Sequence, residues 1–564
     1  MTLLEAPLAK VEALFDRLQV AARLGVRSGL AFDLTARGAK TLVSQLARGR
    51  SGPSTIWRVH AANSPDKLGL IFPASEGRPG EATRSWTYGE LDKEADDLAG
   101  GLRALGLSGK TLLVMMKNRP EYLMLGTGAA RAGTAMVTVS WRSTPSELAY
   151  LVNHSGAGAL VVDAQVAATV EKARGELGVL GDRIFAVGAD VPGLRPFDEL
   201  VRAGLHQHDA KDEGAVVVYT SGTTGKPKGA VRKFNKELLP AVMRFLAETP
   251  MRSDDVHLAA CPLYHTTAFG FIAMSQILGA TVVLLDEFHP TRFLDAIEHH
   301  RVTTTVLVPT MLHRLLAIGE DEIRRRDTRS LAALFCTSAP LPGPDSDLAM
   351  DLFGDIVFNL YGATETGVVT LAHPEDLRRS PGTIGRAVPG NDVRLLDDHG
   401  KDVPDGTVGE LFTKNAMLVA GYHEDEAATR GSMRDGWFSV GDLARRDAHG
   451  CYHLEGRKRD MIISGGVNVY PAEVESILEA HPSVDEVAVI GLPDPEWGER
   501  VTAVVVPKDE GGSEAALKSW CKERLAGPKV PRQFVVLEAG AALPRNPTGK
   551  VLKRDLRARY AEAR

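Results

Sequence analysis

The stretch YTSGTTGKPKGA, residues 219 to 230, contains three glycines, three threonines, a serine and two lysines. Small residues let backbone N–H groups approach an anion closely, and hydroxyl and ammonium groups add further donors. The composition therefore favours a loop that binds a polyphosphate. The preceding run AVVVY, residues 215 to 219, is typical of a buried strand, so we expect this loop to be anchored to a sheet rather than to act as a flexible linker.

This loop differs from the Walker A loop of many nucleotide-binding proteins. A Walker A loop has a glycine five residues before its Gly-Lys pair and continues into a helix. Here Thr220 stands five residues before Gly225, and Pro227 follows Lys226. Because proline lacks a backbone N–H and disfavours a helical residue before it, the chain is not expected to run from Lys226 into a helix.

The composition is that of an ordinary soluble globular protein. The chain has 564 residues, 44% hydrophobic and 24% charged, with a net charge of −6. This length predicts roughly three or four compact units, and the acidic balance argues against a nucleic-acid partner. The four cysteines form no C-x-x-C pair, so neither a zinc site nor a disulfide framework is expected. A reducing cytoplasm is the predicted location.

Two segments bear on membranes. Residues 258 to 285 contain no Asp, Glu, Lys or Arg, but Pro262 and Gly279 interrupt them, which favours a loop, a buried helix over 269–278 and a strand over 281–285. Residues 1 to 50 lack the pattern of a secretory signal and carry scattered basic residues. We expect a helical extension packed on the protein and leave a peripheral membrane contact open.

Apolar strand-like runs alternate with helical patterns through most of the chain, which predicts α/β architecture with parallel sheets. Thr87 and Glu90 form a capping box before a helix. From about Gly382 to Gly456 short β-like runs predict a small β subdomain, and the remaining residues predict a small α+β domain.

Four further motifs follow the opening loop: YGATETG (361–367), DGWFSVGD (435–442), GRKRDMIISGGVNVYPAEVE (456–475) and LPRNPTGKV (543–551). With the 219–230 loop, in this order, they resemble the acyl-adenylate-forming superfamily, which includes acyl-CoA synthetases, firefly luciferase and the adenylation domains of peptide synthetases. The resemblance covers Trp86 to Lys550, and five ordered motifs make a chance match remote.

The resemblance implies a two-step reaction that uses ATP, Mg²⁺ and coenzyme A. A carboxylate attacks the α-phosphate of ATP to give an acyl-adenylate and pyrophosphate, and a thiol then attacks the acyl carbon and releases AMP. It also implies a large N-terminal domain of parallel α/β sheets with a small β subdomain, and a mobile C-terminal domain. The expected boundaries are a helical extension over 1–50, the adenylate-forming domain over 51–456, a hinge over 457–460 and the C-terminal domain over 461–564.

Residue roles follow from the matched motifs. Tyr361 and Gly362 would lie at the adenine, beside Ser338 and Ala339, while Asp442 and Arg457 would contact the ribose. The expected catalytic residues are Lys550, Thr364 and Glu365, with Thr364 at the α-phosphate and Glu365 ligating Mg²⁺ together with Thr220. The β- and γ-phosphates would be held by Thr220, Ser221, Gly222, Thr223, Thr224, Gly225, Lys226 and Lys228.

The second step would be served by the C-terminal domain, which is expected to turn about Arg459 and bring Gly465 and Gly466 to the pantetheine arm of CoA. The segment PLYHTTAFGF, residues 262 to 271, resembles the wall of the acyl pocket, with His265 near the carboxylate and Phe269, Gly270 and Phe271 on an apolar wall. The sequence departs from the family pattern at Ser338, where glycine is usual, and at Phe234, where histidine is common.

The resulting expectation is an ATP-dependent acyl-CoA ligase for a fatty acid of medium or long chain, because residues 258 to 285 offer no charged partner for a polar side chain. Alternatives that remain open are an acyl-AMP ligase that passes the acyl group to a carrier protein, a CoA ligase for an aryl or branched acid, and a non-catalytic ATP-binding sensor. A homodimer is also left open.

Overall fold

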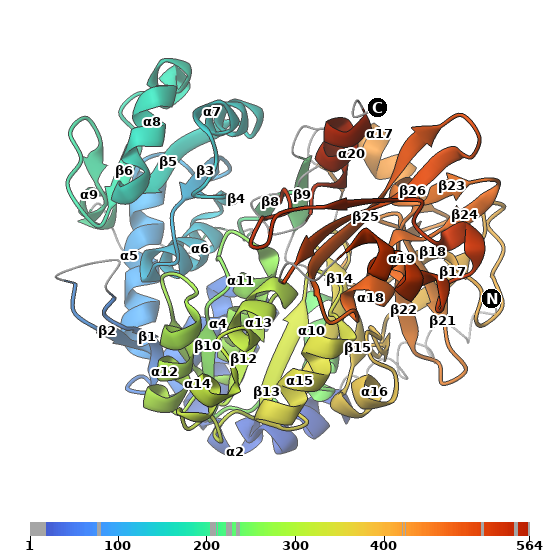
Figure 1. Ribbon diagram of the computed structural model, residues 1–564. Helices are drawn as coiled ribbons and strands as arrows, with labels where there is room; N and C mark the ends of the chain where they lie inside the picture. The colour runs from blue at the N-terminus through green and yellow to red at the C-terminus, as the bar shows by residue number, and fades with distance from the viewer. Residues whose placement is uncertain are drawn as a thin grey trace, which may run out of the picture.

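The frame of the protein consists of two large β-sheets with helices between and around them (Figure 1). The computed structural model describes residues 19–75, 81–202, 210, 213–220, 228–232, 237–419, 421–422, 425–508, 513–545 and 551–561. Within these residues, sheet A has the order β16-β15-β14-β13-β12-β10-β11-β1-β2 and sheet B the order β7-β6-β5-β3-β4-β8-β9. The strands of sheet A are β1 (Leu68–Phe72), β2 (Arg84–Thr87), β10 (Val256–Ala259), β11 (Thr281–Leu284), β12 (Thr304–Leu307), β13 (Ala333–Thr337), β14 (Val357–Ala363), β15 (Gly367–Ala372) and β16 (Arg386–Ala387). Those of sheet B are β3 (Thr111–Met115), β4 (Ala135–Val139), β5 (Ala157–Asp163), β6 (Ile184–Val187), β7 (Arg195–Pro196), β8 (Val216–Thr220) and β9 (Lys228–Arg232).

The central strands of both sheets are parallel, and the antiparallel pairs lie toward the edges, at β1–β2, β14–β15–β16 and β8–β9. The helices before residue 457 are α2 (Leu30–Asp33), α3 (Ala36–Ala47), α4 (Pro53–Asn63), α5 (Tyr88–Ala104), α6 (Pro120–Ala132), α7 (Pro145–His154), α8 (Ala167–Ala173), α9 (Phe197–Arg202), α10 (Leu238–Ala247), α11 (Thr266–Leu278), α12 (Pro290–His300), α13 (Pro309–Leu316), α14 (Glu320–Arg324), α15 (Gly343–Phe353), α16 (Pro374–Arg379) and α17 (Glu426–Gly431). The predicted capping box of Thr87 and Glu90 is confirmed at the start of α5.

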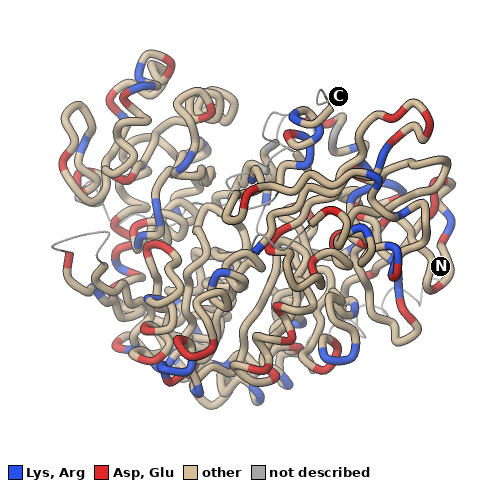
Figure 2. Tube along the Cα trace, in the orientation of Figure 1, with Lys and Arg blue, Asp and Glu red and all other residues tan. Residues whose placement is uncertain are grey.

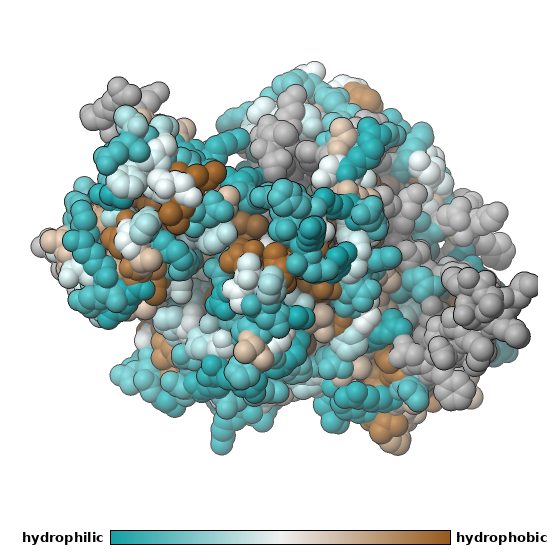
Figure 3. Space-filling view, turned by 90° about the vertical axis from the view of Figure 1, so that its right-hand side faces the viewer, coloured by the Kyte–Doolittle hydropathy of each residue, from teal (hydrophilic) through white to brown (hydrophobic). Residues whose placement is uncertain are grey.

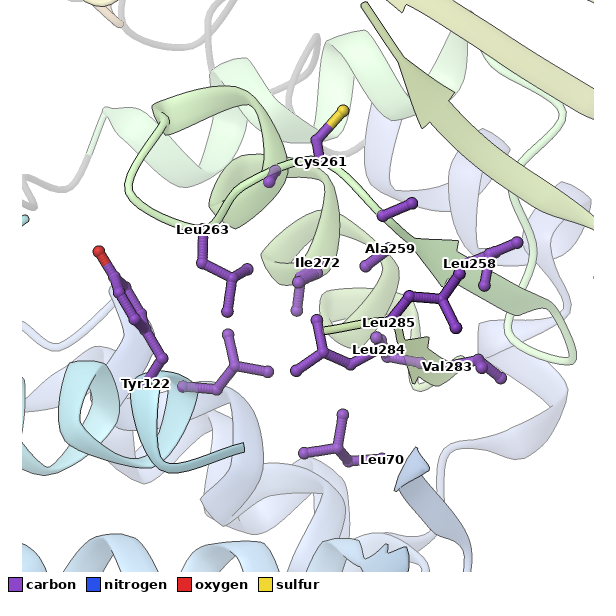
Figure 4. Close-up of a cluster of buried hydrophobic side chains, with 14 of the residues drawn as sticks. Leu70, Tyr122, Leu258, Ala259, Cys261, Leu263, Ile272, Val283, Leu284 and Leu285 are labelled. Atoms are coloured by element: carbon purple, nitrogen blue, oxygen red, sulfur yellow. The ribbon is translucent and has the colours of Figure 1, made fainter. Parts of the chain in front are cut away.

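The main core lies between the two sheets. Strand β3 alternates its side chains between two clusters, because successive residues of a strand point to opposite faces. Leu112 and Val114 join the cluster that also contains Leu70 and Leu284 of sheet A, whereas Leu113 and Met115 pack on the opposite face of sheet B. Figure 4 shows side chains of β1, β10, β11, α6 and α11 pointing toward one another in this core.

Helix α6 runs through this core, and all of its residues are buried. Its Arg131 is compensated inside the core by ion pairs with Asp92 and Asp96 of α5 and by hydrogen bonds to the Ser54 carbonyl. A buried charge needs such partners, because removing them would leave it desolvated and unpaired.

The uncharged stretch 258–285 forms β10, a loop, helix α11 and strand β11, all within the protein, as the sequence predicted. None of the helices in the described part of the chain is long and apolar enough to cross a membrane. In the N-terminal region, residues 19–28, α2 and α3 are helical, and Leu24 is buried against the rest of the protein.

Two smaller sheets complete the fold. Sheet C is antiparallel and contains β17 (Asp392–Leu396), β18 (Gly409–Lys414), β19 (Met433–Arg434), β20 (Trp437–Phe438), β21 (Asp442–Arg446) and β22 (Tyr452–Arg457). The 3-10 turn η4 (Lys458–Asp460) connects it to sheet D, which contains β23 (Ile462–Ser464), β24 (Val467–Val469), β25 (Val484–Asp494), β26 (Gly498–Pro507) and β27 (Gln533–Val536). Helices α18 (Pro471–Glu479), α19 (Glu514–Lys522) and α20 (Lys553–Ala561) accompany sheet D. The predicted fold class, a large α/β domain with a β subdomain and a smaller α+β domain, is confirmed.

The surface carries charges of both signs. Figure 2 shows acidic and basic residues interspersed along the described chain. In Figure 3 hydrophilic residues cover most of the face that lies on the right in Figure 1, with smaller apolar patches between them.

Candidate functional site

The opening loop lies between two strands of sheet B. Strands β8 and β9 are antiparallel, and Thr220 pairs with Lys228 across the loop. The chain thus enters the loop from a strand and leaves it into a strand, which confirms both the predicted anchoring strand and the absence of a following helix. Residues 221–227, Phe234 and Lys550 lie outside the described residues. Of Thr220 and Lys228 only the backbone is described.

Three of the predicted nucleotide contacts lie together where sheet A meets sheet C. Tyr361, near the end of β14, donates its hydroxyl to Oδ2 of Asp442 at 2.8 Å. Arg457 Nε lies 3.2 Å from Oδ1 of the same carboxylate, because Asp442 and Arg457 pair across β21 and β22. Burial and the neighbouring Asp442 hold the pKa of Tyr361 well above its usual value, so the phenol stays a hydrogen-bond donor.

The turn between β14 and β15 brings Thr364 and Glu365 to the same region. The Thr364 hydroxyl lies 3.2 Å from the Thr266 hydroxyl at the start of α11. Glu365 is only 8% exposed, and its Oε1 accepts a hydrogen bond from the Tyr422 hydroxyl at 3.1 Å. Gly362 belongs to this turn for a steric reason, since a Cβ at that position would lie 2.0 Å from the Gly367 carbonyl oxygen.

Ser338 follows β13 in a left-handed backbone conformation, with φ of 76°. A glycine adopts this conformation without strain, which explains physically why the family pattern has glycine there. The Ser338 hydroxyl lies 2.8 Å from that of Thr267, and this hydrogen bond offsets part of the strain. Ala339, the next predicted contact, is partly buried beside it.

A matched pair of variants isolates the backbone strain at Ser338 from the effect of its hydroxyl. Ser338→Ala and Ser338→Gly both lose the hydroxyl, but only glycine relieves the left-handed strain, so we expect the glycine variant to be more stable by about 1 kcal/mol. Unfolding of the two variants by urea measures the difference. Equal stability would mean that the backbone at 338 is not strained.

Two of the predicted acid contacts, Phe269 and Gly270, lie on different faces of α11. Thr266 and Thr267 face Thr364 and Ser338, and a Cβ built on Gly270, one turn further, would meet no described atom within 4 Å. Phe269 instead points toward α6, where its ring would lie 2.8 Å from a Cβ at Gly126. It lines a cavity of about 20 Å³ together with residues of α4 and α6. Phe269 is therefore not brought together with the other predicted residues.

Phe271, also predicted on the apolar wall, is buried in the core on the side of β10 and β13. One turn after Thr267, it stacks on His257 and contacts Phe335 of β13, with ring centroids 6.2 and 4.9 Å apart. His265 occupies the N-cap position of the helix, and its ring packs on that of Tyr264 with centroids 4.3 Å apart.

The glycines predicted to serve CoA form the turn between β23 and β24. Gly465 and Gly466 have φ of 59° and 76°, as a two-residue hairpin turn requires. A Cβ at Gly465 would lie 2.7 Å from the Trp497 ring. This hairpin lies at the right of Figure 1, well apart from β8 and β9. Its role toward CoA stays a prediction, as does the hinge at Arg459, which lies in η4.

A charged cluster connects sheet D and its helices to the rest of the protein. His313 of α13 lies 3.1 Å from Asp345 of α15 and 3.6 Å from Asp485 of β25. The hydrogen bond with Asp345 raises the pKa of His313. Burial, together with Glu475 and Asp345, raises the pKa of Glu479 in α18 to about 7, against the opposing effects of Lys553 and His313.

These shifts predict that the charged cluster around His313 and Glu479 stabilises the fold less as pH rises. Glu479 binds its proton more tightly in the folded protein, so its ionisation between about pH 4.5 and 7 destabilises the fold, and loss of the His313 proton acts in the same direction. We expect Glu479→Gln to match the wild type in thermal midpoint near pH 5 and to exceed it near pH 8. Glu426→Gln, at an exposed site, is the control and should show no pH-dependent difference. A gain for Glu479→Gln that is constant with pH would contradict the prediction.

Comparison with known proteins gives two family matches. Residues 57–423 match the model described as AMP-binding enzyme, and residues 473–550 match the AMP-binding enzyme C-terminal domain. The chain is 38% identical over 484 residues to the feruloyl-CoA synthase of Amycolatopsis sp, covering 84% of this chain and 94% of that protein. It is 32% identical over 512 residues to the long-chain-fatty-acid–CoA ligase FadD13 of Mycobacterium tuberculosis, covering 89% and 97%. ATP-bound MatB from Rhodopseudomonas palustris superposes with a TM-score of 0.79 at 29% identity, covering 90% and 99%.

Proposed function

Because the chain belongs to the AMP-binding enzyme family, as an AMP-forming acid–thiol ligase, we propose that it activates a carboxylic acid of medium or long apolar chain and transfers the acyl group to coenzyme A. The observation that carries this choice of acid is the uncharged face of α11 at Thr267 and Gly270, beside Ser338, where a Cβ on Gly270 would meet no described atom within 4 Å. A face of this kind favours an apolar chain and offers no partner for a charged one.

In the first step an oxygen of the carboxylate attacks the α-phosphorus, and the bond from that phosphorus to the leaving pyrophosphate breaks. Negative charge grows on the phosphate oxygens, so donors held at fixed positions stabilise the transition state more than the substrates. We assign this to the Thr364 hydroxyl, to Lys550 and to the 220–228 loop. Asp442 would accept hydrogen bonds from the ribose hydroxyls and hold the nucleotide.

The donor set suits a magnesium ion brought with ATP. Magnesium is usually held by one or two carboxylates plus substrate phosphates. Glu365 supplies one buried carboxylate, while the described residues contain no group of three or more His, Cys, Asp or Glu side chains arranged around a metal. Glu365 and the Thr220 hydroxyl would hold the ion, which would neutralise charge developing on the leaving pyrophosphate.

In the second step the CoA sulfur attacks the acyl carbon, the bond to the AMP oxygen breaks, and the thiol proton leaves to solvent. The β23–β24 hairpin, which carries Gly465 and Gly466, lies apart from β8 and β9 in Figure 1, which supports a turn of the C-terminal domain between the two steps. We assign the turning point to the η4 segment that contains Arg459.

A second candidate is an aryl acid. The relative at 38% identity is a feruloyl-CoA synthase.

Release of AMP and pyrophosphate with a panel of acids decides between these candidates. The panel contains saturated acids of increasing chain length, aryl propenoic acids and branched acids, each with Mg-ATP and CoA. Turnover confined to saturated chains of medium or long length supports the proposal. Preference for an aryl acid assigns the second candidate.

A further inference from the structure

Strand β9 carries an arginine that the reaction has not yet used. Arg232 is the last residue of β9, directly downstream of the 221–227 loop, and it pairs with Val216 of β8. Its side chain is partly buried and crosses to two other sheets. Nη2 donates to the Thr364 carbonyl at 2.7 Å, and Nη1 donates to the Met417 carbonyl at 2.7 Å.

These two contacts join three parts of the site. Thr364 lies in the turn of sheet A that is assigned to the α-phosphate, and Met417 follows β18 of sheet C. A planar guanidinium presents its donors in a rigid fork, so binding two carbonyls at once fixes both relative to β9. The guanidinium thereby links the loop strand directly to the Thr364 turn.

The neighbouring contacts leave this turn little freedom. The Glu365 carbonyl accepts from Val419 N at 2.9 Å, and its carboxylate accepts from the Tyr422 hydroxyl. Residues 421 and 422 in turn pair with β9, through Val231 N to the Gly421 carbonyl at 3.2 Å. The Glu365 charge also acts on Arg232, so the guanidinium lies within electrostatic reach of the carboxylate.

We propose that Arg232 is a positioning residue for adenylate formation, which holds the Thr364–Glu365 peptide at a fixed place relative to the phosphate-binding strands. Orienting the Thr364 carbonyl orients the rest of that peptide, and with it the hydroxyl and the carboxylate on either side. The proposal rests on the proposed function, because it assigns Arg232 to the same site. Its guanidinium donates to two backbone carbonyls, so we assign it to positioning and not to a direct contact with substrate.

The test compares Arg232→Met with Asn391→Leu. Asn391 also donates to two backbone carbonyls, those of Val368 at 2.7 Å and Val369 at 2.9 Å, but these lie in β15 beyond the turn. Both variants remove two hydrogen bonds to backbone carbonyls and leave an apolar side chain in place, so a merely structural role predicts similar losses in thermal midpoint and similar activities. Arg232→Lys restores the charge without the fork.

A positioning role predicts that only Arg232→Met lowers the first-step kcat, by about 30-fold, with the KM for ATP changed less than about 3-fold. Binding of Mn²⁺ in the presence of ATP, followed by electron paramagnetic resonance, should weaken by about 10-fold in the same variant. Arg232→Lys should fall between the wild type and Arg232→Met. Asn391→Leu should match the wild type in both measurements.

Equal loss of kcat in Arg232→Met and Asn391→Leu would overturn the proposal, as would a rise in KM with unchanged kcat. If Arg232→Met does not fold, Arg232→Lys decides, and a wild-type kcat in that variant overturns it. Wild-type protein that forms no adenylate from any acid contradicts the proposed function instead. In that case the Mn²⁺ measurement alone judges Arg232, and unchanged binding in Arg232→Met overturns the assignment.

Discussion

Glu365→Gln is expected to lower the rate of adenylate formation by about 100- to 1000-fold, because the proposed role of this carboxylate is to hold the Mg²⁺ that neutralises the charge developing on the phosphates. Glu365 is 8% exposed and accepts a hydrogen bond from Tyr422 through Oε1. A glutamine keeps the shape and the acceptor oxygen, so the turn should retain its structure while the negative charge is lost. Exchange of labelled pyrophosphate into ATP, with acid present, measures this step.

The matched control for this variant is Glu455→Gln. Glu455 is also 8% exposed and lies in β22, but its carboxylate pairs with Arg445 Nε at 2.7 Å. We expect this variant to exchange pyrophosphate within about 3-fold of the wild type. Similar losses in the two variants would show that Glu365 acts through the fold and not through the nucleotide.

Lys550→Ala separates the two half-reactions. Removing a cation that acts only while the carboxylate attacks the α-phosphate should reduce adenylate formation by about 100- to 1000-fold. The reaction of supplied acyl-adenylate with CoA should change by less than about 3-fold, because the proposed turn of the C-terminal domain would take Lys550 out of the site before the second step. Both half-reactions are measured separately by the appearance of acyl-adenylate and of thioester.

Arg554→Ala is the control for Lys550→Ala. Arg554 is a neighbouring cation in α20 whose side chain is 73% exposed, so its loss should leave both half-reactions near their wild-type rates. Equal loss of both half-reactions in Lys550→Ala would refute the assignment of this lysine to the first step.

Local patterns predicted the elements that hold the site. The capping box at Thr87 and Glu90, the strand before the opening loop and the helix over 269–278 each depend on residues close in sequence, which propensity and periodicity report directly. The motifs likewise identified Tyr361, Asp442 and Arg457, which the structure brings into contact.

Contacts between distant segments could not be predicted in this way. Arg232 and Thr364 are separated by 132 positions, and only the meeting of sheets A, B and C places them together. The direction of Phe269 depends on how α11 is rotated against α6, which the nearly uniform apolar sequence of that helix leaves undetermined. The strain at Ser338 becomes visible only in the backbone angle.

The central claim, that the chain makes an acyl-adenylate and then an acyl-CoA, is tested most directly by mass spectrometry of the products. The purified protein is incubated with Mg-ATP and the preferred acid of the panel, with and without CoA. The account predicts acyl-AMP and pyrophosphate without CoA, and acyl-CoA and AMP when CoA is added. Thioester formed together with ADP and phosphate, and no acyl-AMP in the absence of CoA, would contradict it.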